Sequence, residues 1–289
     1  MTNNPAHTLP KPVLLTADTS SASFSICLVK DECFFEYNQL ASVQQSAVLF
    51  TAIERICADA EISLSAVDAF GIISGPGSFT GLRSGMSAFK TLAYSGNKPL
   101  YVFNSLDMLS RNIHCPAGDL ILSVIDARRN AFYAALYRLP LMPVPAADHQ
   151  FPSMPVRIGP YLDIPNEKMR AAFQSNREFT STFCDAGAVD EFIKKTITVH
   201  LSGDGSSPCA LLAHDASKSI ESHNDLIPEI SPFHFYSSQL RAAVIAEALQ
   251  ETLHETLQPH KTKPADVLSA APWYLRNSEA ENNKRRTII

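Results

Sequence analysis

The residues whose types are best suited to chemistry form a glycine-rich segment at positions 75–83, GPGSFTGLR. It lies between an apolar run and a helical pattern. Its glycines tolerate positive φ, and Pro76 favours a turn. The first N–H groups of the following helix can bind an anion, whereas Ser78 or Thr80 can cap that helix. A tight turn from a strand into a helix explains the same residues, so the residues alone leave both interpretations open.

Ser78 is the candidate nucleophile of this segment, but its surroundings match no common motif. The glycine spacing differs from G-x-G-x-x-G, no Gly-Lys-Ser or Gly-Lys-Thr follows, and the serine does not lie in a G-x-S-x-G frame. We therefore expect Ser78 to cap the helix or shape the turn, and we predict no catalytic residue in the chain.

The spacing of histidines and cysteines argues against a metal site. None of the nine histidines lies four residues from another, and none of the six cysteines forms a Cys-x-x-Cys pair. Such pairs place two ligands on one helix face or in one turn. We predict no metal ligand, and reduced thiols in place of a disulfide framework.

Asp18 ends an apolar run over residues 13–18 that is predicted to be a buried strand. In residues 23–28, apolar side chains alternate with Ser or Cys, which is the period of a half-buried strand. Residues 33–37 are then predicted to return antiparallel to them. The chain thus opens with a strand, a tight turn and an antiparallel pair.

Asp126 has a similar place in the second half, at the end of an apolar run over residues 119–126 that pairs with residues 132–137 as a hairpin. Both halves therefore open with a strand that ends in Asp and turns back. Since strands and helices also alternate, we predict an α/β class with mixed sheets and two related lobes. Actin, hexokinase and the Hsp70-type ATPases share that architecture.

Further elements follow from periodicity and capping signals. Strands are predicted over residues 68–74, 99–103 and 196–201. Helices are predicted from a capping box at Ser42 and Gln45 to Ala60, along a stripe of Leu82, Met86, Phe89 and Ala93, and over residues 238–257.

Prolines cluster in the middle of the chain. The prolines at positions 140, 143, 145, 152, 155 and 160 predict a connector with extended pieces and no continuous helix over residues 139–165. We expect a loose lead-in over residues 1–11 and a first lobe over residues 12–115. The second lobe is expected over residues 116–289, including the proline-rich insertion at 139–165.

Charge and hydropathy set the expected surroundings. The net charge is −5 and the sequence pI is about 6.0, which argues against a broad basic face for RNA. The one tight basic cluster, at residues 284–286, is interpreted as a solvated tail. No apolar run reaches the ~20 residues that span a bilayer, and the first residues lack the apolar stretch of a secretory signal. We expect a cytoplasmic protein without a membrane partner.

The run GPGSFTGLRSGMSAFKTLA resembles the signature of the TsaB (YeaZ-like) family. The DTS at 18–20 and the VIDAR at 124–128 are similar to the openings of that family's two lobes. The GDG at 203–205 and the PWYLR at 272–276 are similar to later family positions. The resemblance is strong over residues 12–138 and weaker after them.

This resemblance implies a two-lobed actin-like ATPase (ASKHA) fold and a non-catalytic scaffold in the formation of threonylcarbamoyladenosine in tRNA. A complex with a catalytic TsaD-like subunit and a TsaE-like ATPase would transfer threonylcarbamoyl from threonylcarbamoyl-AMP onto the adenosine beside the anticodon. ATP and metal are then expected on the partner subunits, with no cofactor on this chain. Contact with tRNA is expected through the complex, and a homodimer when the chain is alone.

The same resemblance places the partner surface on the helices at about 43–60 and 80–95. The expected partner-binding residues are Leu49, Ile53, Arg83, Met86, Phe89 and Lys90. Arg83 and Lys90 lie seven residues apart and share one helix face. They can pair with acidic groups of a partner or serve only to solvate the helix.

The phosphate-binding positions of actin-like ATPases correspond in this chain to Asp18, Thr19, Ser20 and Asp126. Thr-Ser follows the first aspartate and Ala-Arg-Arg the second, so neither turn contains the glycine of those ATPases. Side chains there would crowd a triphosphate, and we predict a degenerate nucleotide cleft. Aspartates that cap the backbone at strand ends explain the same residues.

An enzyme in its own right is the alternative. A small-molecule kinase of the actin-like type would bind ATP and magnesium at Asp18 and Asp126. A glycoprotease-type peptidase would need a Ser/His/Asp or metal constellation, for which there is no local support in the sequence.

Overall fold

The computed structural model describes residues 11–21, 23–40, 45–113, 115–140, 154–174, 176–184, 199–202, 234–236, 242–256 and 264–274. Within these residues, strands form a five-stranded sheet of order β3-β2-β1-β4-β5 and a six-stranded sheet in which β11-β10-β6-β7-β8 are neighbours and β9 also pairs with β7. The strands of the first sheet are β1 Leu14–Asp18, β2 Ser23–Lys30, β3 Cys33–Leu40, β4 Ala69–Gly75 and β5 Leu100–Asn104. Those of the second are β6 Leu120–Asp126, β7 Ala131–Arg138, β8 Val156–Arg157, β9 Leu162–Pro165, β10 Val199–Ser202 and β11 His234–Tyr236.

The two sheets repeat one pairing scheme. In the first, β1 pairs antiparallel with β2 and parallel with β4; in the second, β6 pairs antiparallel with β7 and parallel with β10. The helices are α1 Gln45–Asp59, α2 Phe79–Gly96, α3 Ser105–Arg111, α4 Asn166–Ala172, α5 Asn176–Phe183 and α8 Ala242–Thr256, with a 3₁₀ turn at Leu64–Ala66. The predicted class, an α/β fold of the two-lobed actin-like type with mixed sheets, is confirmed.

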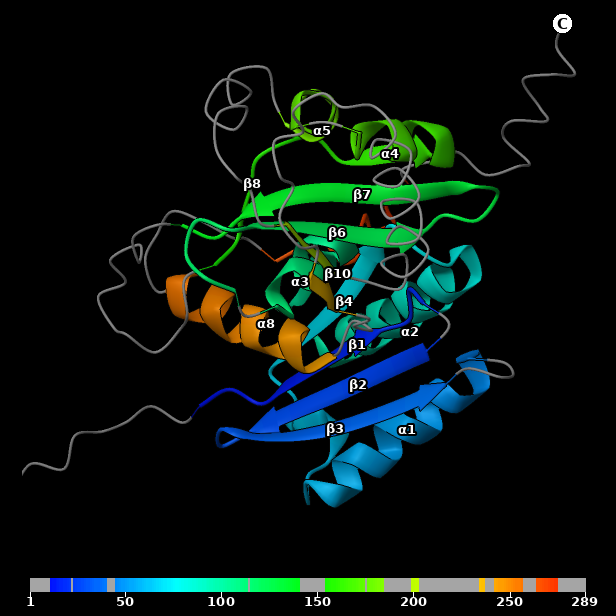
Figure 1. Cartoon of the computed structure of the whole chain (residues 1–289). Helices are drawn as coiled ribbons and strands as arrows, with labels where there is room; N and C mark the ends of the chain where they lie inside the picture. Colours follow the sequence, from blue (N-terminus) through cyan, green and yellow to red (C-terminus); the bar gives the residue numbers. More distant parts are fainter. Residues whose placement is uncertain are drawn as a thin grey trace, which may run out of the picture.

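The elements lie in layers (Figure 1). One face of the first sheet packs against α1 and α2, and its other face packs against α3 and α8. The second sheet faces α3 and α8 from the opposite side and carries α4 and α5 on its outer face. The middle layer therefore belongs to both sheets.

The middle layer explains one wrong prediction. Residues 23–28 alternate as if half-buried, yet β2 is buried on both faces up to Val29. Phe24, Ile26 and Leu28 face α1 and α2, whereas Cys27 lies in the core that α8 completes. On that second face, the Ser25 hydroxyl accepts a hydrogen bond from the Ala242 N–H, 2.8 Å away, at the start of α8.

The C-terminal helix α8 packs on β1 and β2 of the first sheet. The division expected at residues 115/116 placed this helix in the second lobe. In the structure it packs on the first sheet, where the Thr16 hydroxyl of β1 donates a 2.8 Å hydrogen bond to the Ala242 carbonyl of α8. Sequence order therefore differs from packing order at this helix. Residues 238–241 and 257 of the predicted helix lie outside the described residues.

The described part of the proline-rich insertion contains extended pieces, as predicted. The strands β8 and β9 each pair antiparallel with β7, beside the longer strands of the second sheet. Proline lacks an N–H and is tolerated at such sheet edges, where no ladder bond is lost. Residues 141–153 of the insertion lie outside the described part of the chain, as do the lead-in residues 1–10 and the capping Ser42.

The helix α3, which the sequence analysis did not predict, links the lobes. Its signal is Asn104, whose side-chain oxygen accepts from the N–H groups of Leu106 and Asp107. The Asp107 carboxylate accepts hydrogen bonds from the hydroxyls of Tyr137, at 2.7 Å, and Tyr161, at 2.8 Å. Both tyrosines belong to the second lobe, so the Asp107 carboxylate connects the two lobes.

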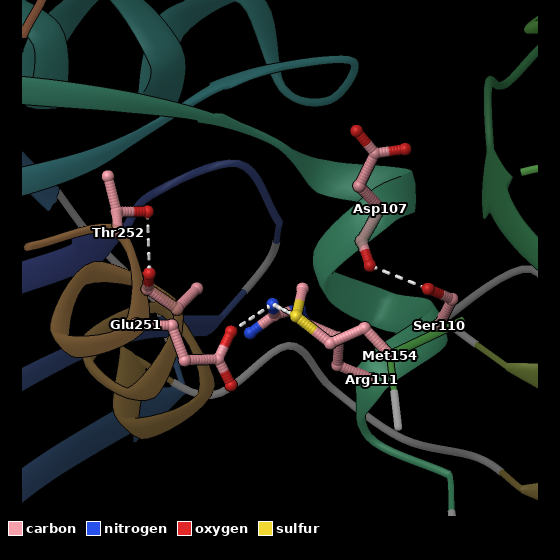
Figure 2. Close-up of polar contacts among 7 residues, drawn as sticks. Asp107, Ser110, Arg111, Met154, Glu251 and Thr252 are labelled. Carbon is pink, nitrogen blue, oxygen red and sulfur yellow. Dashed lines mark hydrogen bonds and ion pairs between the residues drawn. The ribbon is translucent and has the colours of Figure 1, made fainter. Parts of the chain in front are cut away.

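A partly buried ion pair joins α3 to α8 (Figure 2). The Arg111 guanidinium lies 2.5 Å from the Glu251 carboxylate, and the two side chains are 11% and 12% exposed. The same guanidinium contacts the Met154 sulfur at 2.6 Å. Figure 2 shows the Asp107 carboxylate leaving α3 in another direction, so the helix places one polar contact on each of two neighbours.

The tyrosine hydroxyls on Asp107 predict a loss of stability at high pH. Burial first, and then the charge of Asp107, raise the pKa of Tyr161 and of Tyr137 above the ordinary value of about 10. The folded state therefore favours neutral tyrosine, and its advantage is complete below about pH 10, where unfolded tyrosine is also neutral. As pH rises past that value, the unfolded chain loses protons that the folded chain keeps, and the free energy of unfolding falls.

We expect Tyr161→Phe to cost about 1 kcal/mol at pH 7, because one hydrogen bond is lost, and to flatten the fall in unfolding free energy above about pH 10. Urea unfolding between pH 7 and 11 measures both effects. Tyr94→Phe is the matched control, since the Tyr94 side chain is 67% exposed. A Tyr161→Phe profile parallel to that of the parent chain would contradict the assignment.

Candidate functional site

The glycine-rich segment joins β4 to α2 as predicted. β4 ends at Gly75, which has a φ of 124°, and α2 begins at Phe79. Ser78 is the N-cap residue, and its hydroxyl accepts a hydrogen bond from the Gly81 N–H at 3.3 Å. The prediction that Ser78 caps the helix is confirmed.

The segment lies directly on the turn between β1 and β2. The Ser78 N–H donates to the Ser20 carbonyl at 2.6 Å, and the Thr19 hydroxyl donates to the Gly81 carbonyl at 2.8 Å. The Asp18 carboxylate accepts from the Ser20 N–H at 2.8 Å, and all three residues of the turn are buried. The structure thus brings together two motifs that the sequence analysis treated separately.

Two glycines of α2 and its approach permit this contact. A Cβ at Gly77 would clash with the Ser20 carbonyl, and a Cβ at Gly85 would clash with the Thr19 side chain. Both glycines are thus required by space, because backbone and side chain of the β1–β2 turn occupy the volume that a larger residue would need. At Gly75, a Cβ would meet the Trp273 carbonyl oxygen.

Asp126 lies in the corresponding turn of the second lobe. Its carboxylate accepts from the Arg128 N–H at 2.8 Å, and Arg128, Arg129 and Asn130 have φ of 60°, 54° and 57°. Asn130 accepts a hydrogen bond from the Asn166 N–H at the start of α4. In both turns, therefore, the aspartate holds an N–H group of its own turn, as a strand-end cap would.

The apolar residues expected on the partner surface lie in the core. Leu49 and Ile53 on α1 are 1% and 2% exposed, and Met86 and Phe89 on α2 are 2% and 0% exposed. Phe89 packs edge-on against Phe70 of β4, with ring centroids 6.0 Å apart. These side chains attach the helices to the first sheet, so their assignment as surface contacts is corrected.

Arg83 and Lys90 hold a C-terminal segment of the same chain. Lys90 Nζ donates to the carbonyls of Leu268, at 2.9 Å, and Ala270, at 2.8 Å. Arg83 Nε donates to the Tyr274 hydroxyl at 3.1 Å. From the sequence, Arg83 and Lys90 could pair with acidic groups of a partner or only solvate the helix; in the structure they bind a segment of their own chain.

We call residues 264–274 the C-terminal strap. Its Ala265 N–H donates to the Leu100 carbonyl at the edge of β5, and its Trp273 N–H donates to the Ser74 carbonyl of β4 at 2.7 Å. The Trp273 ring meets the Tyr161 ring at 5.1 Å. The strap therefore runs from the edge of the first sheet, along α2, to the second lobe.

No group of three His, Cys, Asp or Glu side chains in the described residues is arranged to hold a metal ion. No helix among them is long and apolar enough to cross a membrane. The GDG at 203–205 and the basic cluster at 284–286 lie outside the described residues.

The close approach at Gly77 leads to a stability prediction. Gly77→Ala should lower the free energy of unfolding by about 1–3 kcal/mol, since the Ser20 backbone must shift. Gly96→Ala is the matched control, because its Cβ meets only the flexible Lys98 side chain. We expect the control to gain up to about 1 kcal/mol from helix propensity. Urea unfolding of both variants tests this, and equal stabilities would contradict the packing.

The burial of Phe89 leads to a second prediction on stability. Phe89→Ala should lower the free energy of unfolding by about 3–5 kcal/mol, because it opens a cavity between α2 and the sheet. Ser87→Ala, at an exposed position of the same helix, should change it by less than about 0.5 kcal/mol. Unfolding in urea compares the two, and a stable Phe89→Ala variant with weaker partner binding would restore the surface assignment.

Comparison with known proteins places the chain in a family. The family model "TsaD: tRNA N6-adenosine threonylcarbamoyltransferase" matches residues 38–284. The TsaB protein of Bacillus subtilis is 31% identical over 126 residues, which is 43% of this chain and 55% of that protein. The TsaB protein of Haemophilus influenzae is 30% identical over 123 residues, 42% of this chain and 51% of that protein. The match thus spans about half the length of these curated relatives.

Solved structures agree on the fold. YeaZ from Pseudomonas aeruginosa has a TM-score of 0.63 and 19% identity over 91% of this chain and 100% of that chain. At this identity the likeness establishes the fold, and the family model, which covers most of the chain, establishes the family. The chain therefore belongs to the family that the model "TsaD: tRNA N6-adenosine threonylcarbamoyltransferase" describes, and it is similar to TsaB proteins over part of their length.

Proposed function

We propose that this chain is a non-catalytic subunit in the biosynthesis of threonylcarbamoyladenosine in tRNA and that it binds a TsaD-type catalytic partner. The observation that carries the proposal is the family match over residues 38–284 together with the TsaB relatives. A TsaE-type ATPase as third subunit, tRNA contact through the complex and a cytoplasmic location belong to the same proposal.

The groups at the candidate site support a structural role for it. The Ser78 hydroxyl accepts from Gly81, and the Ser20 and Arg128 N–H groups donate to the carboxylates of their own turns. A phosphate bound by these turns would have to replace those carboxylates as the acceptor. We therefore propose that the nucleotide cleft expected at these turns is degenerate and that ATP and metal act on the partner subunits.

The same contacts bear on the alternative functions. A peptidase would need the Ser78 hydroxyl activated by a base, but this hydroxyl is engaged as a helix cap. A kinase would need N–H groups of the two turns to bind phosphate, but the N–H groups of Ser20 and Arg128 donate to the carboxylates of Asp18 and Asp126. No interaction among the described residues favours either enzyme, so we retain the scaffold as the single proposal.

The exposed face of α2 is the proposed docking surface. Small hydroxyl side chains at Thr80, Ser87 and Thr91 repeat at helical spacing along it, and the 67% exposed Tyr94 follows them. Small side chains let another backbone approach closely, and an exposed tyrosine is typical of interface anchors. The face can serve a TsaD-type partner or, in the isolated chain, a second copy of this chain.

Ser87→Arg tests this surface. A long charged side chain in the middle of the small-residue row should weaken the complex with a TsaD-type partner at least about tenfold, or ~1.4 kcal/mol. Ser181→Arg, an equal change at an exposed position of α5 in the second lobe, is the control. Titration calorimetry or size-exclusion co-elution measures the affinity, and urea unfolding checks that both variants stay folded.

Equal binding by both variants would show that the docking surface lies elsewhere.

Reconstitution of the modification reaction tests the function as a whole. We expect no threonylcarbamoyladenosine when this chain is omitted from a mixture of the partner subunits, tRNA, ATP, threonine and the enzyme that makes threonylcarbamoyl-AMP. Full activity without the chain would refute the proposed function.

A further inference from the structure

The C-terminal strap is attached by hydrogen bonds and by side chains that are only partly buried. Lys90, Leu100 and Ser74 each provide a donor or acceptor to its backbone, and Arg83 donates to the Tyr274 hydroxyl. None of the eleven residues 264–274 is buried. By contrast, every residue of β4, to which the strap is hydrogen-bonded, and of the neighbouring β1 is buried.

This balance of contacts distinguishes the strap from the core. Segments with few buried apolar contacts and exposed hydrogen bonds open at a lower free energy than the core of the same domain. Val267 and Ala270 pack against the first-lobe core, and Tyr274 packs against the middle-layer core, each as a partly buried side chain at the rim. Release of the strap would therefore leave the sheets and the middle layer intact.

The strap also connects distant parts of the molecule. Along α2, Lys90 holds the Leu268 and Ala270 carbonyls, and Arg83 lies 3.9 Å over the Phe79 ring, which itself meets Tyr274. Beside Tyr274, the Trp273 ring packs on Tyr161 of the second lobe. The strap is thus in contact with both α2, which begins in the glycine-rich segment, and the second lobe.

The contact in the second lobe leads to the junction between lobes. Trp273 packs against Tyr161, whose hydroxyl donates to both oxygens of Asp107 at 2.8 Å. The Arg157 guanidinium covers the same Tyr161 ring at 4.3 Å. A continuous series of contacts therefore runs from α2 through the strap to α3.

We propose that the strap is a latch that docks and releases as a unit, and that its docked state couples the position of α2 to the second lobe. Release frees the Leu100 carbonyl at the β5 edge and the Ser74 carbonyl, together with the flank of α2 that carries Lys90. A partner segment in extended conformation can then use the same backbone groups. This last step rests on the proposed function, whereas the latch itself does not.

The chain contains its own reporter, because Trp273 is its single tryptophan. Lys90→Met keeps the aliphatic stem but removes both hydrogen bonds to the strap. We expect the undocked population to rise about tenfold or more, since hydrogen bonds to charged groups are the stronger ones and ~1.4 kcal/mol is tenfold. Trp273 emission should move to longer wavelength, acrylamide quenching should increase, and the Trp273 amide should lose hydrogen-exchange protection.

Lys98→Met is the matched control, since Lys98 pairs with Asp68 at 3.4 Å and does not touch the strap. Amides of β1 and β4 should keep their protection in both variants. The latch is refuted if Lys90→Met leaves Trp273 as protected as in the parent chain. It is equally refuted if β1 and β4 lose protection together with Trp273, because the strap would then be part of the core unit.

A second experiment tests the coupling to a partner. Incorporation of 5-fluorotryptophan into this chain alone gives one fluorine resonance, at Trp273, in the presence of an unlabelled TsaD-type partner. We expect this resonance to shift toward its position in Lys90→Met when the partner binds. Co-elution without a shift overturns partner access through the strap. Failure to co-elute counts against the proposed function, while the latch is still decided by the isolated chain.

Discussion

The close approach of the β1–β2 turn to the start of α2 is the constraint on which most of this structure depends. Ser20 and Thr19 hydrogen-bond to Ser78 and Gly81, and the glycines at 77 and 85 leave the space for them. This contact sets both the position and the rotation of α2. It thereby decides which stripe of the helix enters the core, which stripe faces outward, and where Arg83 and Lys90 meet the strap.

The second constraint is a middle layer shared by two sheets. Helices α3 and α8 must cover the first sheet and the second at once, and each carries polar groups into that layer. Asp107 accepts two tyrosine hydroxyls, and Arg111 pairs with Glu251. Buried polar groups stabilise a fold only when they find their partners, so these contacts favour one orientation of the lobes. Within the described residues, the strap adds a contact between the lobes outside this layer, through Trp273 and Tyr161.

Amphipathic helices explain where the partner surface was misplaced. The stripe of Leu82, Met86 and Phe89 is apolar, and an apolar stripe marks the face that is removed from water. Whether a sheet of the same chain or a second chain removes it is a matter of tertiary packing. In this fold the sheet covers that stripe, and the outward face has small hydroxyl side chains that give little signal in a sequence.

Much of this protein could be predicted from local pattern. The strands that end at Asp18 and Asp126, the hairpins after them, the Ser78 cap and the glycine-rich start of α2 all follow from short-range rules on periodicity, turns and capping. The family resemblance lies in these same segments. The tertiary structure alone decided what depends on residues far apart: the burial of β2 on both faces, the return of α8 to the first sheet, the joining of Asp107 to Tyr161, and the use of Arg83 and Lys90 to hold the strap. The physical reason is that periodicity reports how often a side chain leaves water, whereas only the folded chain determines which neighbour replaces the water.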